Sequence, residues 1–193
     1  MKKVFLVFLC AATFNAAKAQ IQFGVKAGAN LSTFAGKDIE DAKSVIGFNG
    51  GGLVRLPINE NFKVQPEIVF SAQGSKGDGE FGEEKINLSY INIPVMFQYH
   101  TESGFFAETG PQVGFLAKSK LKSGDISVDI DEGMKKVDFA WGLGVGYQLP
   151  MGFGVNARYN HGLSSIFDSE GGESIKARNS VFQLGIFYVF GGE

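Results

Sequence analysis

The chain contains a single cysteine, and that residue, Cys10, lies in an apolar N-terminal segment. If this segment is removed, no disulfide or thiol chemistry is available to the rest of the protein. After residue 20 the chain also lacks any apolar run of the roughly 20 residues that a transmembrane helix needs. A membrane span must therefore be built from β-strands that close into a barrel, because lipid cannot satisfy a free sheet edge.

The N-terminus has the features of a secretory signal peptide, predicted over residues 1–19. Two lysines precede the apolar segment Val4–Phe14, and Ala17-Lys18-Ala19 supplies the small residues that a signal peptidase requires. Cleavage would leave one domain, residues 20–193, which keeps 15 of the 18 basic residues beside 20 acidic ones. This acidic balance argues against nucleic acid as a partner.

Apolar residues alternate with small or polar residues along the rest of the chain. In Phe139–Leu149, large apolar side chains occupy every second position, and Gly142, Gly144 and Gly146 lie between them. Successive side chains of a β-strand point to opposite faces, so the pattern predicts strands with one apolar face. Eight strands are predicted, each long enough to cross a membrane at a tilt: Ile21–Ser32, Val45–Leu56, Phe62–Ala72, Asn87–Tyr99, Gly104–Ala117, Val137–Leu149, Phe153–Leu163 and Asn179–Phe190.

The predicted connections alternate between long and short. The long ones are Thr33–Ser44, Gln73–Ile86, Lys118–Lys136 and Gly162–Arg178, and the short ones are Pro57–Asn61, His100–Ser103 and Pro150–Gly152. Outer-membrane barrels have short periplasmic turns and longer extracellular loops. The fold expected is therefore an all-β, eight-stranded antiparallel up-and-down transmembrane β-barrel, with periplasmic termini and extracellular long loops.

The alternation alone does not decide which face of the strands lies outside. In a soluble lipocalin-like barrel the apolar face would point inward around a ligand, whereas in a membrane barrel it contacts lipid. The polar face mixes charges of both signs with many glycines, which suits a narrow filled interior. Aromatic residues also gather near strand ends, where an interfacial girdle belongs: Phe62, Tyr99, Phe105, Tyr147, Phe153, Tyr188 and Phe190. Both observations favour lipid outside.

Several short motifs resemble those of a known family. They are Gly24–Leu31, Tyr90–Pro94, Glu108–Gly114, Gly142-x-Gly-x-Gly-Tyr147 and Arg158–Leu163. Their order along the chain is similar to that of the Bacteroidetes-type outer-membrane β-barrel domain, a family often labelled "porin family" or PorT-like. The resemblance implies a small eight-stranded barrel and carries no assigned activity for most members.

Charged residues on the polar face predict a network inside the barrel. A charge in so narrow a lumen is costly unless it is paired and hydrogen-bonded. Gly142, Gly144 and Gly146 would leave room there for arginine and glutamate side chains of neighbouring strands. The predicted network comprises Lys26, Arg55, Lys63, Glu67, Glu108, Asp138 and Arg158. The alternative is a charged pathway for a small solute or ion.

Other candidate sites are weaker. The acidic stretch around Asp129 does not match a calcium-binding loop, and no metal or cofactor site is predicted. His161 lies near Ser164, Ser165, Asp168 and Glu170, which leaves a rim lipid hydrolase open as a third function. No catalytic residue is assigned, and an enzyme is not expected.

The function expected from the sequence is a non-enzymatic barrel with a filled lumen, in a surface-binding or envelope-structural role. The runner-up is a narrow porin that passes small solutes. Outer-membrane lipid and lipopolysaccharide are expected partners of a monomeric barrel, and an extracellular or envelope protein could bind through the loops. Ile126, Val128 and Ile130 alternate with polar residues in the longest loop, so a hairpin there is predicted to bind a partner by strand addition.

Overall fold

The computed structural model describes residues 21–36, 42–79, 82–123, 126–130, 134–166 and 177–191. The predicted signal peptide, residues 1–19, lies outside these ranges and stays a prediction. Within them, no helix is long and apolar enough to cross a membrane.

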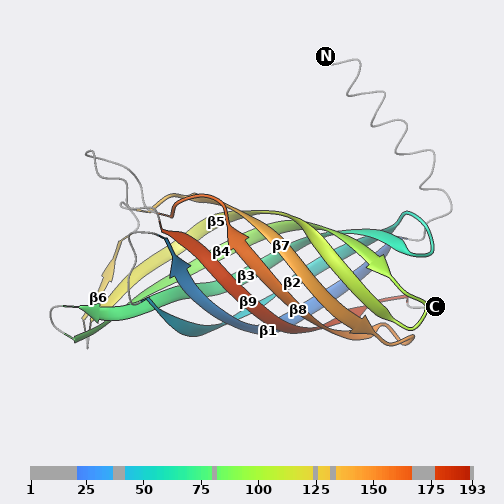
Figure 1. Ribbon diagram of the computed structural model, residues 1–193, viewed down its shortest axis with the longest axis horizontal. Coiled ribbons are helices and arrows are strands. Elements are labelled where there is room, and N and C mark those ends of the chain that lie inside the picture. The colour runs from blue at the N-terminus through green and yellow to red at the C-terminus, as the bar shows by residue number, and fades with distance from the viewer. Residues whose placement is uncertain are drawn as a thin grey trace, which may run out of the picture.

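Eight long antiparallel strands form a closed barrel, as Figure 1 shows. Each strand pairs with its neighbours around the wall, and β1 pairs with β9 to close it. The predicted fold is therefore confirmed. The strands of the wall are β1 (Gln22–Ala35), β2 (Lys43–Pro57), β3 (Phe62–Gly79), β4 (Gly82–His100), β5 (Phe105–Ser123), β7 (Val137–Gln148), β8 (Phe153–Gly162) and β9 (Arg178–Val189).

A ninth short strand, β6 (Ile126–Asp129), lies beyond the wall at the long-loop end of the barrel (Figure 1). Residues 105–115 of β5 pair with β7, and residues 120–123 pair with β6 instead. β5 and β6 thus form a hairpin that extends past the start of β7, as the sequence predicted for the longest loop.

The predicted loop boundaries were wrong in several places, because the strands are longer than expected. The predicted loop Gln73–Ile86 is a β-ladder that runs from the pair Gln73–Leu88 to the pair Gly79–Gly82. Residues 118–123 likewise belong to β5. Glycine and charged residues favour loops in general, but backbone hydrogen bonds between strands continue regardless of side-chain type. Outside the bilayer such strands have no need of an apolar face.

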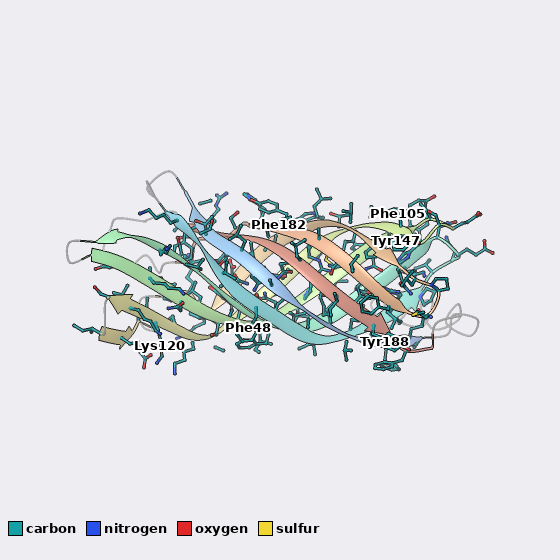
Figure 2. The ribbon with its side chains drawn as sticks, turned by 90° about the horizontal axis from the view of Figure 1, so that it is seen from below. Phe48, Phe105, Lys120, Tyr147, Phe182 and Tyr188 are labelled. Atoms are coloured by element: carbon teal, nitrogen blue, oxygen red, sulfur yellow. The ribbon has the colours of Figure 1, made fainter. Side chains whose placement is uncertain are left out.

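The apolar face points outward, which confirms the membrane-facing arrangement over the lipocalin-like one. Phe48, Leu143 and Leu184 are 61%, 64% and 56% exposed, whereas Arg55 and Arg158 are buried in the lumen. At the short-turn end, aromatic rings pair edge to face, with 4.8 Å between the ring centroids of Phe105 and Tyr147. Figure 2 shows Phe105, Tyr147 and Tyr188 at the end opposite Lys120. This places an aromatic girdle at one edge of the apolar band.

Candidate functional site

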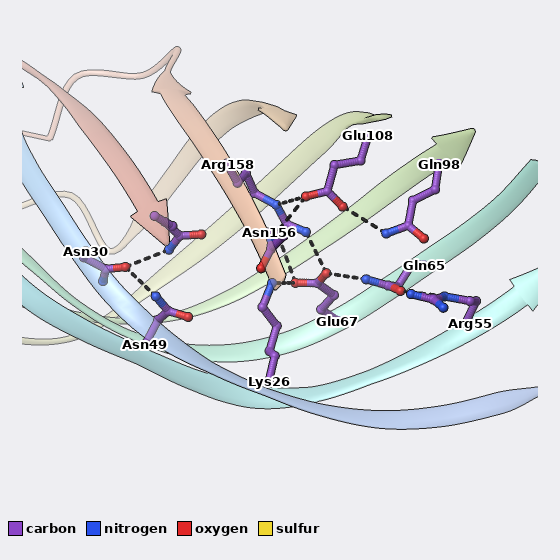
Figure 3. A network of polar contacts seen from close by, with 11 residues as sticks. Lys26, Asn30, Asn49, Arg55, Gln65, Glu67, Gln98, Glu108, Asn156 and Arg158 are labelled. Atoms are coloured by element: carbon purple, nitrogen blue, oxygen red, sulfur yellow. Dashed lines mark hydrogen bonds and ion pairs between the residues drawn. The ribbon is translucent and has the colours of Figure 1, made fainter. Parts of the chain in front are cut away.

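The centre of the lumen holds a cluster of four ion-paired side chains (Figure 3). Arg158 of β8 donates two hydrogen bonds to Glu67 of β3, of 2.9 and 2.8 Å, and one of 2.7 Å to Glu108 of β5. The Nζ atom of Lys26 on β1 lies 3.0 Å from Glu67 Oε2. All four side chains are buried. Two cations and two anions from four strands thus neutralise one another inside the barrel, and we call them the central cluster.

Amide side chains extend the central cluster toward the short-turn end. Gln65 donates to Glu67 over 2.8 Å, and Gln98 donates to Glu108 over 2.9 Å. Arg55 donates to the carbonyl oxygens of Gln65 and Gln148. Arg55 therefore reaches the cluster through an amide rather than through a carboxylate.

Two residues of the predicted network lie apart from the central cluster, which corrects that grouping. Asp138 accepts hydrogen bonds from Ser164 and Asn179, toward the long-loop end. β7 pairs Gly144 with Glu108 but Asp138 with Gly114, so Asp138 sits six residues, or about 20 Å, further along the strand.

Lys63 is the other separated residue. It is paired with Gln98 near the start of β3, and it lines a cavity of about 370 Å³ at the short-turn end together with His100 and Gln148. Both Asp138 and Lys63 thus lie at other positions along the barrel axis than the central cluster. The alternation of residues shows which face a side chain is on, but not its position along the axis.

The three glycines of β7 make room for neighbours, but not only for the charged ones predicted. A Cβ atom added at Gly144 would lie 2.8 Å from Glu108 Oε1. At Gly146 it would lie 2.3 Å from the Phe106 ring, and at Gly142 3.1 Å from Met96 Cε. Gly144 therefore accommodates the central cluster, Gly146 accommodates the Phe106 ring, and Gly142 accommodates Met96 together with the Asn160 amide.

Two apolar clusters, missed by the sequence analysis, lie inside the barrel on either side of the charges. One contains Leu53, Phe106, Phe187 and Val189. The other contains Phe34, Leu88, Tyr90, Met134, Ile166 and Ala177. The second brings connecting segments over the mouth, where Lys135 N–H donates to the Ile166 carbonyl and Ile166 N–H to the Ala177 carbonyl, both over 2.9 Å.

An amide-rich layer fills the space between the central cluster and the long-loop end. Asn30 donates to Ser71 Oγ over 3.0 Å. It accepts hydrogen bonds from Asn49 (Figure 3) and from Gln183. Along the described barrel the lumen is therefore filled by apolar side chains, then charges, then amides, then apolar side chains again. Apolar constrictions of this kind oppose ion passage because they exclude water.

The residues proposed for a rim hydrolase do not come together in the described part of the chain. Ser164 donates to Asp138, and His161 is exposed on the outer face, where its ring lies 6.2 Å from that of Tyr159. Asp168 and Glu170 lie outside the described residues. The described residues also contain no group of three or more His, Cys, Asp and Glu side chains arranged to hold a metal ion.

The β5–β6 hairpin carries two of the three residues predicted to contact a partner. Ile126 and Val128 are 67% and 51% exposed. Ile130 is half-buried and packs against the apolar cluster of Leu88 and Tyr90, so less of its side chain is exposed to a partner. An apolar side chain packed against such a cluster is more stable than one surrounded by water.

Ile130 N–H donates to the Ser119 carbonyl over 3.3 Å. In an antiparallel pair, residues bonded to the partner strand alternate with residues whose backbone groups point away. Ile126 and Val128 therefore bond toward β5, and the N–H groups of Ser127 and Asp129 point to the other edge. That edge of β6 pairs with no strand among the described residues.

Comparison with known proteins agrees with this architecture. Residues 13–168 match the sequence model of the outer membrane protein beta-barrel domain. No curated protein sequence matches the chain significantly. Among solved structures, the Neisserial surface protein A has a TM-score of 0.61 and 13% identity, covering 86% of this chain and 96% of its own.

Two other solved structures are similar. Ail, the attachment invasion locus protein of Yersinia pestis, in complex with the heparin analogue sucrose octasulfate, has a TM-score of 0.53 and 17% identity, over 89% of this chain and 99% of its own. The outer membrane protein OprG from Pseudomonas aeruginosa has a TM-score of 0.50 and 13% identity, over 89% and 97%. At these identities the likeness shows the fold alone.

Proposed function

The chain belongs to the outer membrane protein beta-barrel domain family, and from that premise we propose that it is a non-conducting surface-binding protein. The β5–β6 hairpin is the binding element, and the long-loop end faces the outside of the cell. The narrower assignment, to the Bacteroidetes-type PorT-like group, rests on motifs such as Tyr90–Pro94 and Glu108–Gly114 and is part of the proposal.

The outer edge of β6, with which no strand of the described residues pairs, is the observation that carries this proposal. A free strand edge offers a row of backbone donors and acceptors, and proteins commonly blunt such edges. Here the edge stands clear of the wall, with Ile126 and Val128 exposed beside it. An extended peptide segment of a partner would add as a further strand, held by backbone bonds and by contacts with these side chains.

The filled lumen supports binding over transport. A narrow porin needs a hydrated path, whereas buried apolar side chains lie on both sides of the central cluster. Refolded protein in a planar bilayer should show little steady conductance. Stable ion-selective pores would favour the narrow porin instead.

The binding proposal is tested at Ser127, whose N–H points to the free edge. Ser127→Pro removes that donor and leaves the β5–β6 ladder bonds intact, so partner binding to intact cells should fall at least tenfold. Ser127→Ala keeps the N–H and is the matched control. Equal binding by both variants would contradict strand addition.

Orientation is tested separately. A tag placed next to β6 should be labelled in intact cells without permeabilising the outer membrane. Labelling only after permeabilisation would place the hairpin in the periplasm and end the surface-binding proposal.

A further inference from the structure

A groove runs across the outer face of the wall, over the neighbouring strands β5, β7, β8, β9 and β1 (Figure 1). Its volume is about 750 Å³, and its lining is almost entirely apolar. Strand pairing arranges the lining residues in three parallel rows, and we call the whole the outer groove. The first row is Phe105, Tyr147, Val155, Ile186 and Ala27, the middle row is Gly146, Asn156, Gly185 and Gly28, and the third row is Val145, Ala157 and Leu184.

The first and third rows point toward lipid and form the two sides of the groove. Val145, Leu184 and Ile186 are 60%, 56% and 52% exposed. The middle row occupies inward-facing positions, so only its backbone reaches the outer face. Ala27 and Ala157 carry only methyl groups, so the groove stays open between the larger side chains.

Glycines of the middle row fix the shape of the groove. A Cβ atom added at Gly28 would lie 2.3 Å from the Leu184 carbonyl oxygen, and one added at Gly146 would lie 2.6 Å from the Val155 carbonyl oxygen. So close an approach to a neighbouring backbone is a use of glycine that also permits a tight bend of the sheet. A wall that bends toward the lumen spreads the side chains on its outer face. The groove is therefore a property of the folded backbone.

The groove climbs from the aromatic girdle to the middle of the apolar band. Phe105 is the first residue of β5, and Tyr147 is the last residue but one of β7, both at the short-turn end (Figure 2). Ala27, at the other end of the same row, lies five residues beyond the start of β1. Five residues rise about 13 Å along the barrel axis at a strand tilt of about 40°. Half of an apolar band of about 25 Å is about 12 Å, so the groove spans one leaflet.

The dimensions of the groove select its occupant. Four inter-strand gaps give it a length of about 19 Å, and its two sides lie two residues, or about 7 Å, apart along the strands. That width admits one unbranched hydrocarbon chain and excludes a helix of about 10–12 Å. A chain in the groove contacts side chains on both sides, whereas an empty groove would lose these dispersion contacts.

The two ends of the groove differ in polarity. Tyr147, at the girdle end, also lines the cavity of about 370 Å³ at the short-turn end, together with Thr101, Ser103 and Gln148. Ala27, at the other end, is surrounded by the apolar band. A molecule that suits both ends has a polar head at the girdle and an apolar tail that extends to the middle of the membrane.

We propose that the outer groove binds one acyl chain of a phospholipid from the periplasmic leaflet. The chain follows from the shape and apolar lining of the groove. The leaflet rests on the proposed outward orientation of the long-loop end, which places the girdle of Phe105 and Tyr147 on the periplasmic side. The phospholipid is thus a ligand of one defined part of the wall, from β5 to β1.

Native mass spectrometry of the refolded full-length barrel in detergent, titrated with dipalmitoyl phosphatidylethanolamine, tests the proposal. Ala157→Phe fills the middle of the groove and should bind this lipid about tenfold more weakly than wild type. Ala29→Phe is the matched control, because Ala29 is exposed on the outer face of β1 but does not line the groove. Its affinity should stay within about twofold of wild type.

A second comparison needs no variant. Wild-type protein should bind dihexanoyl phosphatidylethanolamine about tenfold more weakly than the dipalmitoyl lipid, because short chains leave most of the groove empty. If Ala157→Phe does not recover heat-modifiable gel mobility, Ala27→Phe at the upper end of the groove takes its place, with the same expected loss.

Equal losses in Ala157→Phe and Ala29→Phe would overturn the proposal, because the added ring rather than its position would then be responsible. Equal affinity for the short and long lipids would assign binding to the headgroup and would also overturn it. A wild-type dimer that takes up no phospholipid, and that Ala157→Phe converts to a monomer, would assign the groove to a second copy of the chain. Tighter binding of lipopolysaccharide than of phospholipid, lost in Ala157→Phe, would assign the groove to the other leaflet.

Ser127→Pro separates this inference from the proposed function. That substitution should abolish strand addition at β6 and leave phospholipid binding unchanged, whereas Ala157→Phe should do the reverse. Loss of phospholipid binding in Ser127→Pro would assign the lipid to the hairpin and overturn the groove as its site.

Discussion

The central cluster and the lysine ladder are two groups of four charged residues with opposite arrangements. In the lumen, Lys26, Arg158, Glu67 and Glu108 neutralise one another at distances of 2.7–3.0 Å. On the outer face, the lysine ladder consists of four like charges aligned by the strand register of β2 to β5: Lys43, Lys76, Lys85 and Lys122. A buried charge must find its counterion within the protein, because desolvation is otherwise too costly. A charge on the exposed outer face can be hydrated or meet a counterion from solution, so it carries a smaller desolvation cost.

The largest effect is expected in the central cluster. Arg158→Ala leaves Glu67 and Glu108 buried without their shared cation and should lower the free energy of unfolding by about 3–5 kcal/mol. Urea unfolding of the refolded protein, followed by heat-modifiable gel mobility, measures the change. Arg178→Ala removes an exposed arginine and is the control. Equal midpoints would show that the cluster does not stabilise the barrel.

A charge placed in the middle of the outer apolar band should destabilise the barrel more than a charge placed near the edge of the band. Leu184→Arg, near the middle of β9, should destabilise the barrel in lipid by about 2–4 kcal/mol. Ile46→Arg, close to the long-loop end of β2, should cost about 0–1 kcal/mol. Unfolding from lipid vesicles compares the two variants. Similar losses at both positions would show that the lipid-facing band extends to the long-loop end of β2.

A methyl group tests how completely the lumen is filled. Gly146→Ala would bring its Cβ atom to 2.3 Å from the Phe106 ring and should cost about 1–3 kcal/mol through overpacking. At Gly52 the nearest atom to an added Cβ lies 3.8 Å away, so Gly52→Ala should be neutral or slightly stabilising. Denaturant midpoints in the same detergent give both values. A harmless Gly146→Ala would reveal free space in the lumen.

The smallest effect has the opposite sign and belongs to the ladder. Lys85→Gln removes repulsion from Lys76 and Lys122 and should raise the free energy of unfolding in uncharged detergent by about 0.2–1 kcal/mol. Added salt should abolish the gain, because it screens exposed charges far more than buried ones. Arg158→Ala should keep its loss in the same salt. A salt-dependent loss at Arg158 would mean that the central cluster is hydrated.

Prediction from the sequence succeeded where a local pattern reports a local property. The alternation in Phe139–Leu149 identified β7 and its outward face, and most of the charges expected in the lumen are there. It failed where composition resembled that of a loop, as in Gln73–Ile86, and it placed Asp138 with charges that lie about 20 Å away along the strand. Leu88 and Tyr90 were missed as lumen residues because they are apolar on an inward face that also carries polar residues such as Asn92 and Gln98.

The sequence by itself determined the strands of the barrel and the apolar face of each, because a period of two is a property of each strand alone. The tertiary structure decided which residues meet. Lys26, Glu67, Glu108 and Arg158 converge from β1, β3, β5 and β8 only through the pairing register of the whole wall. The same register aligns Lys43, Lys76, Lys85 and Lys122 on β2 to β5. That register depends on turns and on the irregularities in β2 and in the β4–β5 pair, and a shift of one residue would move every side chain beyond it to the other face.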